Sequence, residues 1–80
     1  MMTTGPTPVE AAKRVLMILV EILHRSPGQA IRLDTVQTEF LSDAWTLVDF
    51  QNGLTYAAER HWIEVRDREA VLTDNGFAKV

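Results

Sequence analysis

The chain contains no cysteine, which excludes a disulfide framework, a thiol nucleophile and a cysteine-based zinc site. It also has no long apolar run. The longest, at residues 15–20, is far shorter than the ~20 residues that a membrane-spanning helix requires. No basic segment with a small-residue cleavage site precedes that run. We therefore expect a cytoplasmic protein without a membrane partner.

Basic residues are outnumbered, with 8 lysines and arginines against 11 aspartates and glutamates and a formal net charge of −3. This balance opposes adhesion to nucleic acid without excluding it. A hydrophobic content of 46% with 24% charged residues is typical of a globular protein. At 80 residues, we expect a flexible tail at residues 1–7 and one domain at residues 8–80.

A long first helix is predicted over residues 8–25, with Pro8 at its first position, Thr7 as its cap and Ser26-Pro27-Gly28 as its stop. Apolar side chains form two rows along it and leave only a narrow polar row. Such a helix either lies at the centre of the domain or has an excess apolar face that pairs with a second copy. The second interpretation predicts a homodimer through this helix, because so short a chain has little material to cover both rows.

Three further elements follow. Residues 29–33 alternate enough for a short edge strand, and Asp34 is the expected cap of a helix over residues 35–41. A third helix is predicted over residues 44–61, with Ser42 and Asp43 as capping candidates. Gly53 in its middle indicates either a close helix contact or bend, or an ordinary surface glycine.

After residue 61 the apolar period changes from 3.6 to 2, which predicts two strands joined by the charged turn Arg66-Asp67-Arg68-Glu69. Thr73 or Asp74 is expected to cap a last helical turn, with Phe77 and Val80 closing the edge of the core. We expect Val65 to help to secure the hairpin. The predicted core comprises Leu16, Leu19, Leu23, Val36, Phe40, Leu47, Phe50, Leu54, Ile63 and Leu72.

The expected order is a helix, a small strand, two helices and a hairpin. Trp62-Ile63 ends the third helix, and Leu72-Thr73-Asp74-Asn75-Gly76 follows the second hairpin strand. This combination resembles MarR-type and PadR-type bacterial transcriptional regulators over residues 8–77. The resemblance implies an α+β winged-helix domain, with a three-helix core and a C-terminal β-hairpin wing. Those families usually have glycine at the position of His61.

The resemblance also implies a DNA-binding function, in which the third helix enters a major groove and the wing touches the adjoining backbone. Asn52 could then read adenine, and arginines could hold phosphates. Asp49 lies on the same expected helix face. The candidate DNA-binding residues are Thr46, Asn52, Tyr56, Arg60, Arg66 and Arg68.

The charge of the same region favours an alternative. Between residues 43 and 69 there are three arginines against six carboxylates, whereas strong DNA binders draw most non-specific affinity from basic residues. If exposed, Trp45, Val48 and Tyr56 would form an aromatic patch with an acidic rim, which suits a protein partner. A protein-interaction module that does not bind DNA therefore stands beside the DNA-binding regulator as a second hypothesis.

An enzyme is not expected. His24 and His61 lie on different predicted helices, no glycine-rich phosphate loop follows a strand, and no nucleophile, base and orienting acid can be assembled. Two histidines without a paired carboxylate motif do not predict a metal site. We therefore expect neither a cofactor nor a metal.

Overall fold

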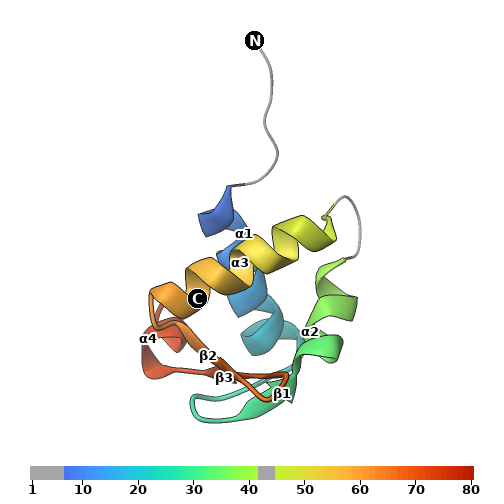
Figure 1. Cartoon of the computed structure of the whole chain (residues 1–80). Helices are drawn as coiled ribbons and strands as arrows, with labels where there is room; N and C mark the ends of the chain where they lie inside the picture. The colour runs from blue at the N-terminus through green and yellow to red at the C-terminus, as the bar shows by residue number, and fades with distance from the viewer. Residues whose placement is uncertain (1–6, 42–44) are drawn as a thin grey trace.

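The computed structural model describes residues 7–41 and 45–80, and within them it is a small α+β domain (Figure 1). Helices and an antiparallel sheet follow one another in the predicted order. The elements are α1 (Pro8–Met17), η1 (Ile18–Ile22), β1 (Ala30–Arg32), α2 (Leu33–Phe40), α3 (Leu47–Glu59), β2 (Ile63–Arg66), β3 (Glu69–Leu72) and α4 (Asp74–Phe77). The tail predicted before Thr7 and the candidate caps Ser42 and Asp43 lie outside the described residues.

The start of α1 is fixed by a reciprocal capping box. The hydroxyl of Thr7 accepts a hydrogen bond from the amide of Glu10 at 3.2 Å, and the Thr7 amide donates to the Glu10 carboxylate at 2.8 Å. Pro8 occupies the first turn, where its missing amide hydrogen costs nothing. The predicted cap and first residue of this helix are confirmed.

The end of this helix differs from the prediction. The α-helix gives way to a π-helical turn, η1, in which the Leu23 amide bonds to the Ile18 carbonyl at 2.9 Å. His24 then adopts a left-handed backbone conformation with φ of 53°, and the Arg25 amide turns back to the Leu19 carbonyl at 2.7 Å. These bonds satisfy carbonyls at the helix end. Residues 23–25 are therefore not helical.

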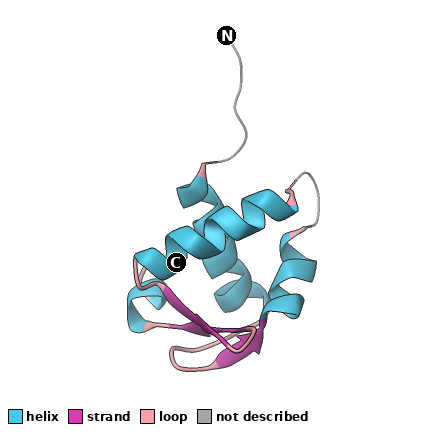
Figure 2. Ribbon diagram, viewed as in Figure 1, coloured by secondary structure: helices cyan, strands magenta, loops and turns pink. Residues whose placement is uncertain are grey.

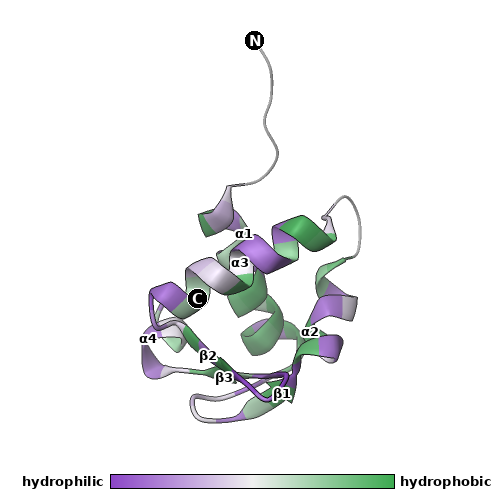
Figure 3. Cartoon of the chain, viewed as in Figure 1, coloured by the Kyte–Doolittle hydropathy of each residue, from purple (hydrophilic) through white to green (hydrophobic). Residues whose placement is uncertain are grey.

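Most of the two apolar rows of this helix is covered within one copy of the chain, although Ile22 at its end is 44% exposed. Six of its side chains are at most 1% exposed: Ala11, Ala12, Val15, Leu16, Ile18 and Leu19. The central position that the sequence allowed is therefore observed, and Figure 3 shows this hydrophobic helix behind α3. The large excess apolar face that motivated the prediction of a homodimer through this helix is reduced to Ile22, and the homodimer itself stays a prediction.

The contact between α1 and α3 is a backbone contact at Gly53. A Cβ on Gly53 would lie only 2.8 Å from the carbonyl carbon of Ala11. Real Cβ atoms essentially never approach backbone so closely, so only glycine fits without a shift of one helix. Of the two interpretations of Gly53, the close helix contact is confirmed.

The link from α1 to α2 is made by Arg14. Its guanidinium donates to the carbonyl of Phe40 at 3.1 and 3.2 Å and lies over the rings of Phe40 and Trp45. It thus caps the carbonyl end of α2 with a cation. The start of α2 differs from the prediction, because Asp34 lies inside the first turn and Arg32 occupies the cap position without a side-chain bond.

The sheet is antiparallel, with β3 between β1 and β2 (Figure 2). Ala30 pairs with Val71 and Arg32 with Glu69 on one side of β3, while Ile63 pairs with Leu72 on the other. Ala70 and Leu72 are buried against the helices, so the alternate residues of β3 face away from them. The predicted strand at residues 29–33 is thus confirmed as the edge strand β1.

The hairpin turn between β2 and β3 consists of Asp67 and Arg68, within the predicted charged segment. Both residues have positive φ, 51° and 63°. A two-residue hairpin loop with two positive φ angles is a type I′ turn, which matches the twist of the strands but normally contains glycine or asparagine. The turn is therefore locally strained.

The observed core contains most of the predicted one. Leu16, Leu19, Val36, Phe40, Phe50, Ile63 and Leu72 are buried, whereas Leu23 and Leu54 are half-buried against it. The prediction is wrong for Leu47, which is 46% exposed because α3 begins at this residue and turns it outward. Val65 at 44% exposure, Phe77 and Val80 were also expected to pack inward and are exposed.

Thr73, which follows β3, is bonded to the two residues that follow the C-terminal end of α3. Its hydroxyl lies 2.6 Å from the His61 carbonyl oxygen and 2.8 Å from that of Trp62, and accepts from the Gly76 amide at 3.0 Å. A Cβ on Gly76 would meet the Trp62 carbonyl oxygen, so the α4 backbone rests directly on it. Thr73 is confirmed as the cap, and the Leu-Thr-x-x-Gly segment is seen to fasten the hairpin to α3.

Candidate nucleic-acid interface on α3 and the wing

The first turn of α3 is a second capping box. The Thr46 hydroxyl accepts from the Asp49 amide at 3.1 Å, and the Asp49 carboxylate accepts from the Thr46 amide at 3.1 Å. This places the helix start at Leu47 instead of Ala44. Thr46 and Asp49 were both expected on a contact surface, yet their polar atoms are turned to the helix's own backbone.

The solvent-facing crest of α3 is defined by two hollows on its flanks. Thr55 and Glu59 line both a hollow shared with Pro8 and another shared with Val65, so they lie between the two. Helical spacing places Asn52 and Val48 on the same line. We name these four residues, Val48, Asn52, Thr55 and Glu59, the crest; all four are exposed. Its first three members are uncharged.

Tyr56 and Arg60 are brought together at the end of α3. The Arg60 guanidinium lies 4.9 Å from the centroid of the Tyr56 ring, and that ring packs edge-on against Trp62 with centroids 5.6 Å apart. A cation stacked on an aromatic ring at an exposed site contributes about 0.5–1 kcal/mol of stabilisation. Tyr56 is therefore half-buried in a stack beside the crest, while Arg60 is exposed at the crest's acidic end.

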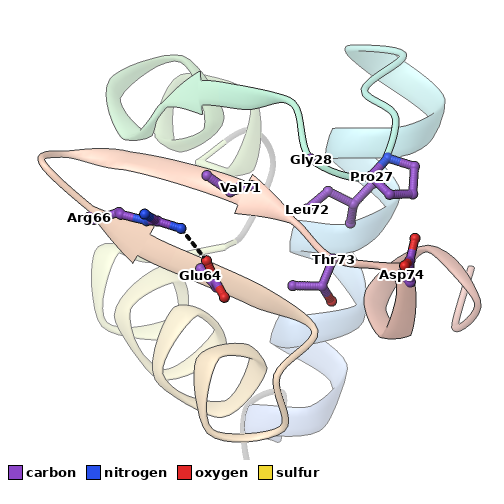
Figure 4. A pocket seen from close by; sticks show the side chains of 8 residues that line it. All are labelled: Pro27, Gly28, Glu64, Arg66, Val71, Leu72, Thr73 and Asp74. Atoms are coloured by element: carbon purple, nitrogen blue, oxygen red, sulfur yellow. Dashed lines mark hydrogen bonds and ion pairs between the residues drawn. The ribbon is translucent and has the colours of Figure 1, made fainter.

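Arg66 lies on the face of the sheet that is remote from the helices. It forms an ion pair with Glu64, and Figure 4 shows this pair on the outer surface beside Val71. The strand pairing places Glu69 between Arg66 and Arg32 across this face. Both arginines thus have carboxylates beside them, and the outer face carries alternating charge instead of a positive stripe.

A hollow of about 460 Å³ adjoins this pair on the outer face (Figure 4). Pro27 and Gly28 form one wall, and Thr73 and Asp74 another. The Thr73 hydroxyl is already bonded to the end of α3, as described above. The remaining charged groups are exposed, so the hollow has no buried polar side chain that would select a ligand.

Arg68 lies at the tip of the wing. Its carbonyl accepts from the Leu33 amide at 2.9 Å, which ties the turn to the start of α2, while its side chain is exposed. No ion pair to its guanidinium occurs within the described residues. Arg68 is therefore an exposed arginine of the hairpin turn without a direct ion pair among the described residues, although its charge helps to lower the pKa of Asp34.

The residues predicted to form an aromatic patch are separated by packing. Trp45 lies edge-on against Phe40, with ring centroids 5.2 Å apart, and beneath the Arg14 guanidinium at 5.0 Å. Tyr56 belongs to the stack with Trp62. Only Val48 of the three is fully open, at 62% exposure.

An apolar hollow lies between α3 and β2. Leu54, Ala58 and Val65 line it, with Thr55 and Glu59 at its rim, and its volume is about 320 Å³. Val65 belongs to the inner face of the hairpin but lies near its tip, beyond the reach of the core. This hollow was not predicted, because Leu54 was placed in the core and Val65 was expected to secure the hairpin.

One ion pair, between Arg32 and Asp34, shifts the pKa values of both of its members. The Arg32 guanidinium donates to the Asp34 carboxylate at 2.8 Å, and this hydrogen bond and charge hold the pKa of Asp34 below its usual value of 3.8. The same pair raises the pKa of Arg32. Both side chains are exposed, so the pair contributes little to folding.

Sequence reasoning missed Thr55 and its neighbour Gln51, which are exposed on α3. The signal that could have found them is Thr46-x-x-Asp49, which has the spacing of a capping box. Starting the helix at Leu47 would have assigned Thr46 and Asp49 to the cap. The contact face would then have been drawn through Gln51, Asn52 and Thr55.

Among residues 7–41 and 45–80, no helix has both the length and the apolar character needed to cross a membrane. The same residues contain no group of three or more histidine, aspartate or glutamate side chains arranged to hold a metal ion. No protein-family model, curated protein or solved structure matches the chain.

Proposed function

We propose that the chain is a winged-helix domain that binds double-stranded DNA, as a transcriptional regulator would. The order of its elements, with α2 and α3 followed by a hairpin, is that of the winged helix. In this arrangement α3 is the helix presented to the major groove, and the tip of the wing meets the adjoining backbone.

The observation that carries the proposal is the run of three uncharged, exposed residues on the crest of α3: Val48, Asn52 and Thr55. Asn52 and Thr55 offer amide and hydroxyl groups to base edges, and Gln51 lies beside them. Asparagine and glutamine pair with adenine in the major groove, while the apolar Val48 suits the methyl group of thymine. The Asp49 carboxylate is held by the Thr46 amide at the helix start and so does not point along the crest, although it keeps its negative charge.

Phosphate contacts are assigned to Arg68 at the tip and Arg60 at the end of α3. Arg66 contributes less, because Glu64 neutralises it on the outer face of the sheet. With so few cations, non-specific binding is expected to be weak and base contacts to supply a large share of the affinity. A shallow dependence of affinity on salt distinguishes this protein from strongly basic DNA binders.

Binding is tested by fluorescence anisotropy against a pool of random duplexes, followed by selection of the retained sequences. We expect enrichment of a short motif containing A·T pairs. Asn52→Ala should cost about 1–3 kcal/mol in binding to that motif, which is roughly tenfold or more in affinity. Asn75→Ala, which removes an exposed asparagine from α4, is the matched control and should leave affinity unchanged.

The wing contribution is tested with arginine variants. Arg68→Ala should weaken binding to every duplex and reduce the salt slope, whereas Arg32→Ala on the far strand should do neither. No binding to any duplex at low salt, by a chain shown to be folded, would contradict the DNA-binding function.

A protein-interaction module is the second candidate, and the hollow between α3 and β2 is the observation that favours it. Leu54, Ala58 and Val65 are apolar and open there, with Glu59 at the rim. Open apolar surface rimmed by polar groups is typical of protein contact sites. Leu54→Gln should then abolish capture of a protein partner while leaving any DNA binding by Asn52 and Arg68 intact.

A further inference from the structure

The strand β2 has a free edge. The sheet order places β3 on one side of it, and no strand among the described residues lies on the other. An unpaired strand edge presents backbone donors and acceptors to any chain of matching shape. On a wing that projects from the helices, this edge is the natural place for an added strand.

The backbone groups that face this edge follow from the pairing of β3. Leu72 turns its amide toward the Gln29 carbonyl and its carbonyl toward the Gly28 amide, so both groups face away from β2. Since the direction alternates along a strand, Val71 and Glu69 bond to Glu64 and Arg66. The amides and carbonyls of Ile63 and Val65 therefore point outward.

The edge is complementary to itself. If two copies of β2 run antiparallel with Val65 opposite Val65 of the second copy, the two valines exchange a pair of backbone hydrogen bonds. In this register Glu64 of each copy lies opposite Arg66 of the other. Cross-strand pairs of opposite charge stabilise a sheet by roughly 0.2–1 kcal/mol each.

We propose that two copies of the chain associate through their β2 edges and form one continuous sheet across the two wings. The sequence Glu64-Val65-Arg66 supplies both the charge complement and the central apolar residue. The valine of the second copy would also lie toward the hollow lined by Leu54, Ala58 and Val65, which is open in a single copy. The proposed interface therefore lies at the hairpin edge and not on the first helix, most of whose apolar side chains are covered within one copy.

Charge reversal at the edge tests this arrangement by sedimentation equilibrium of the full chain. The wild-type mass should rise from 9.0 kDa toward twice that value with concentration. Glu64→Arg places arginines opposite one another, and Arg66→Glu does the same with glutamates. Each variant should weaken association roughly tenfold or more, because two attractive pairs become repulsive.

Mixing the two variants restores the pairing of opposite charges between the two strands. In the mixed pair, both edge positions are arginine in one chain and glutamate in the other, so each cross-strand pair again joins opposite charges. The mixture should dimerise while each variant alone stays monomeric. Arg32→Glu, which makes a similar charge reversal at the opposite edge of the sheet, is the control and should leave association unchanged. Circular dichroism confirms that every variant is folded.

The remaining outcomes overturn the proposal. A wild-type chain that is monomeric at all concentrations has no such interface. A dimer that resists both single variants, or a mixture that fails to associate, places the contact elsewhere. A monomer whose β2 edge captures an extended peptide in a library screen would assign the edge to a different partner.

Discussion

Gly53 and Ala11 lie in backbone contact, and this contact sets the distance between α1 and α3. Gly53→Ala would place a methyl group 2.8 Å from the Ala11 carbonyl carbon. The expected overpacking of about 1–3 kcal/mol exceeds the gain of about 1 kcal/mol in helix propensity. Urea denaturation should therefore show a net loss of stability.

A control separates the contact from a general effect of alanine. Asn52→Ala on the exposed side of the same helix should be neutral or slightly stabilising. Ala11→Gly should not rescue Gly53→Ala, because two of the three closest atoms are backbone. Equal stability of Gly53→Ala and the wild-type chain would show that the lost contact costs only as much as the gain of about 1 kcal/mol in helix propensity, and would contradict the expected net loss.

His61 has φ of 60°, a left-handed conformation at the end of α3 that favours glycine. His61→Gly should raise the free energy of unfolding by up to about 1 kcal/mol, since relief of strain exceeds the added entropy of the unfolded chain. His61→Ala keeps the strain and should bring no gain. Thermal denaturation of the two variants in parallel provides the measurement.

Thr73→Val keeps the shape of the side chain and removes the hydroxyl that joins His61, Trp62 and Gly76. The substitution removes the cap of α4 and the hydrogen bond to the carbonyl groups that follow α3. This loss should lower the free energy of unfolding by about 1–3 kcal/mol, measured by urea denaturation. Thr73→Ser retains the hydroxyl and should cost much less. Similar losses for valine and serine would assign the effect to the methyl group instead.

The wing turn allows stability and binding to be changed in opposite directions. Replacing Asp67-Arg68 by Asn-Gly suits the two positive φ angles and should stabilise the domain by roughly 0.5–1 kcal/mol. The same change removes the exposed arginine and should weaken DNA binding. A more stable chain that binds every duplex as before would exclude Arg68 from the interface.

Acid should release the Arg32 and Asp34 pair. Because the pKa of Asp34 is lowered in the folded chain, the pair stabilises folding above the usual pKa of 3.8 and loses its effect as pH falls through the lowered value. Arg32→Gln should raise the pKa of Asp34 toward its usual value, as followed by NMR titration, because Arg32 is the largest cause of the shift. Stability should hardly change, because both groups are exposed.

The helices and the hairpin could be predicted because capping residues, stops and the change of period are local signals. Thr7, Thr73 and the charged turn are examples. The contact face of α3 was not drawn correctly, because Thr46 and Asp49 were assigned to the helix surface although they form its cap. Helical spacing placed Leu47 in the core and alternation placed Val65 against the helices, although their exposure depends on how far the helices and the hairpin diverge.

The burial of α1 could not be predicted from the sequence and is seen only in the three-dimensional structure. Its two apolar rows are equally consistent with a buried helix and with a dimer interface until Gly53 is seen to admit α3 against it. The partly buried position of Trp45 is likewise set in part by Arg14, which is distant in the chain, whereas Tyr56 is held by its near neighbours Arg60 and Trp62. Arg14 reaches the end of α2 through such a contact, which no spacing rule indicates.

The central place of β3 has a consequence for truncated chains. Among the described residues both outer strands pair only with β3, so β1 has no strand partner until residues 69–72 are available. The contact between α1 and α3 needs no residue beyond α3. The sheet therefore depends on pairing between segments distant in sequence, and a chain truncated before residue 69 could not form it.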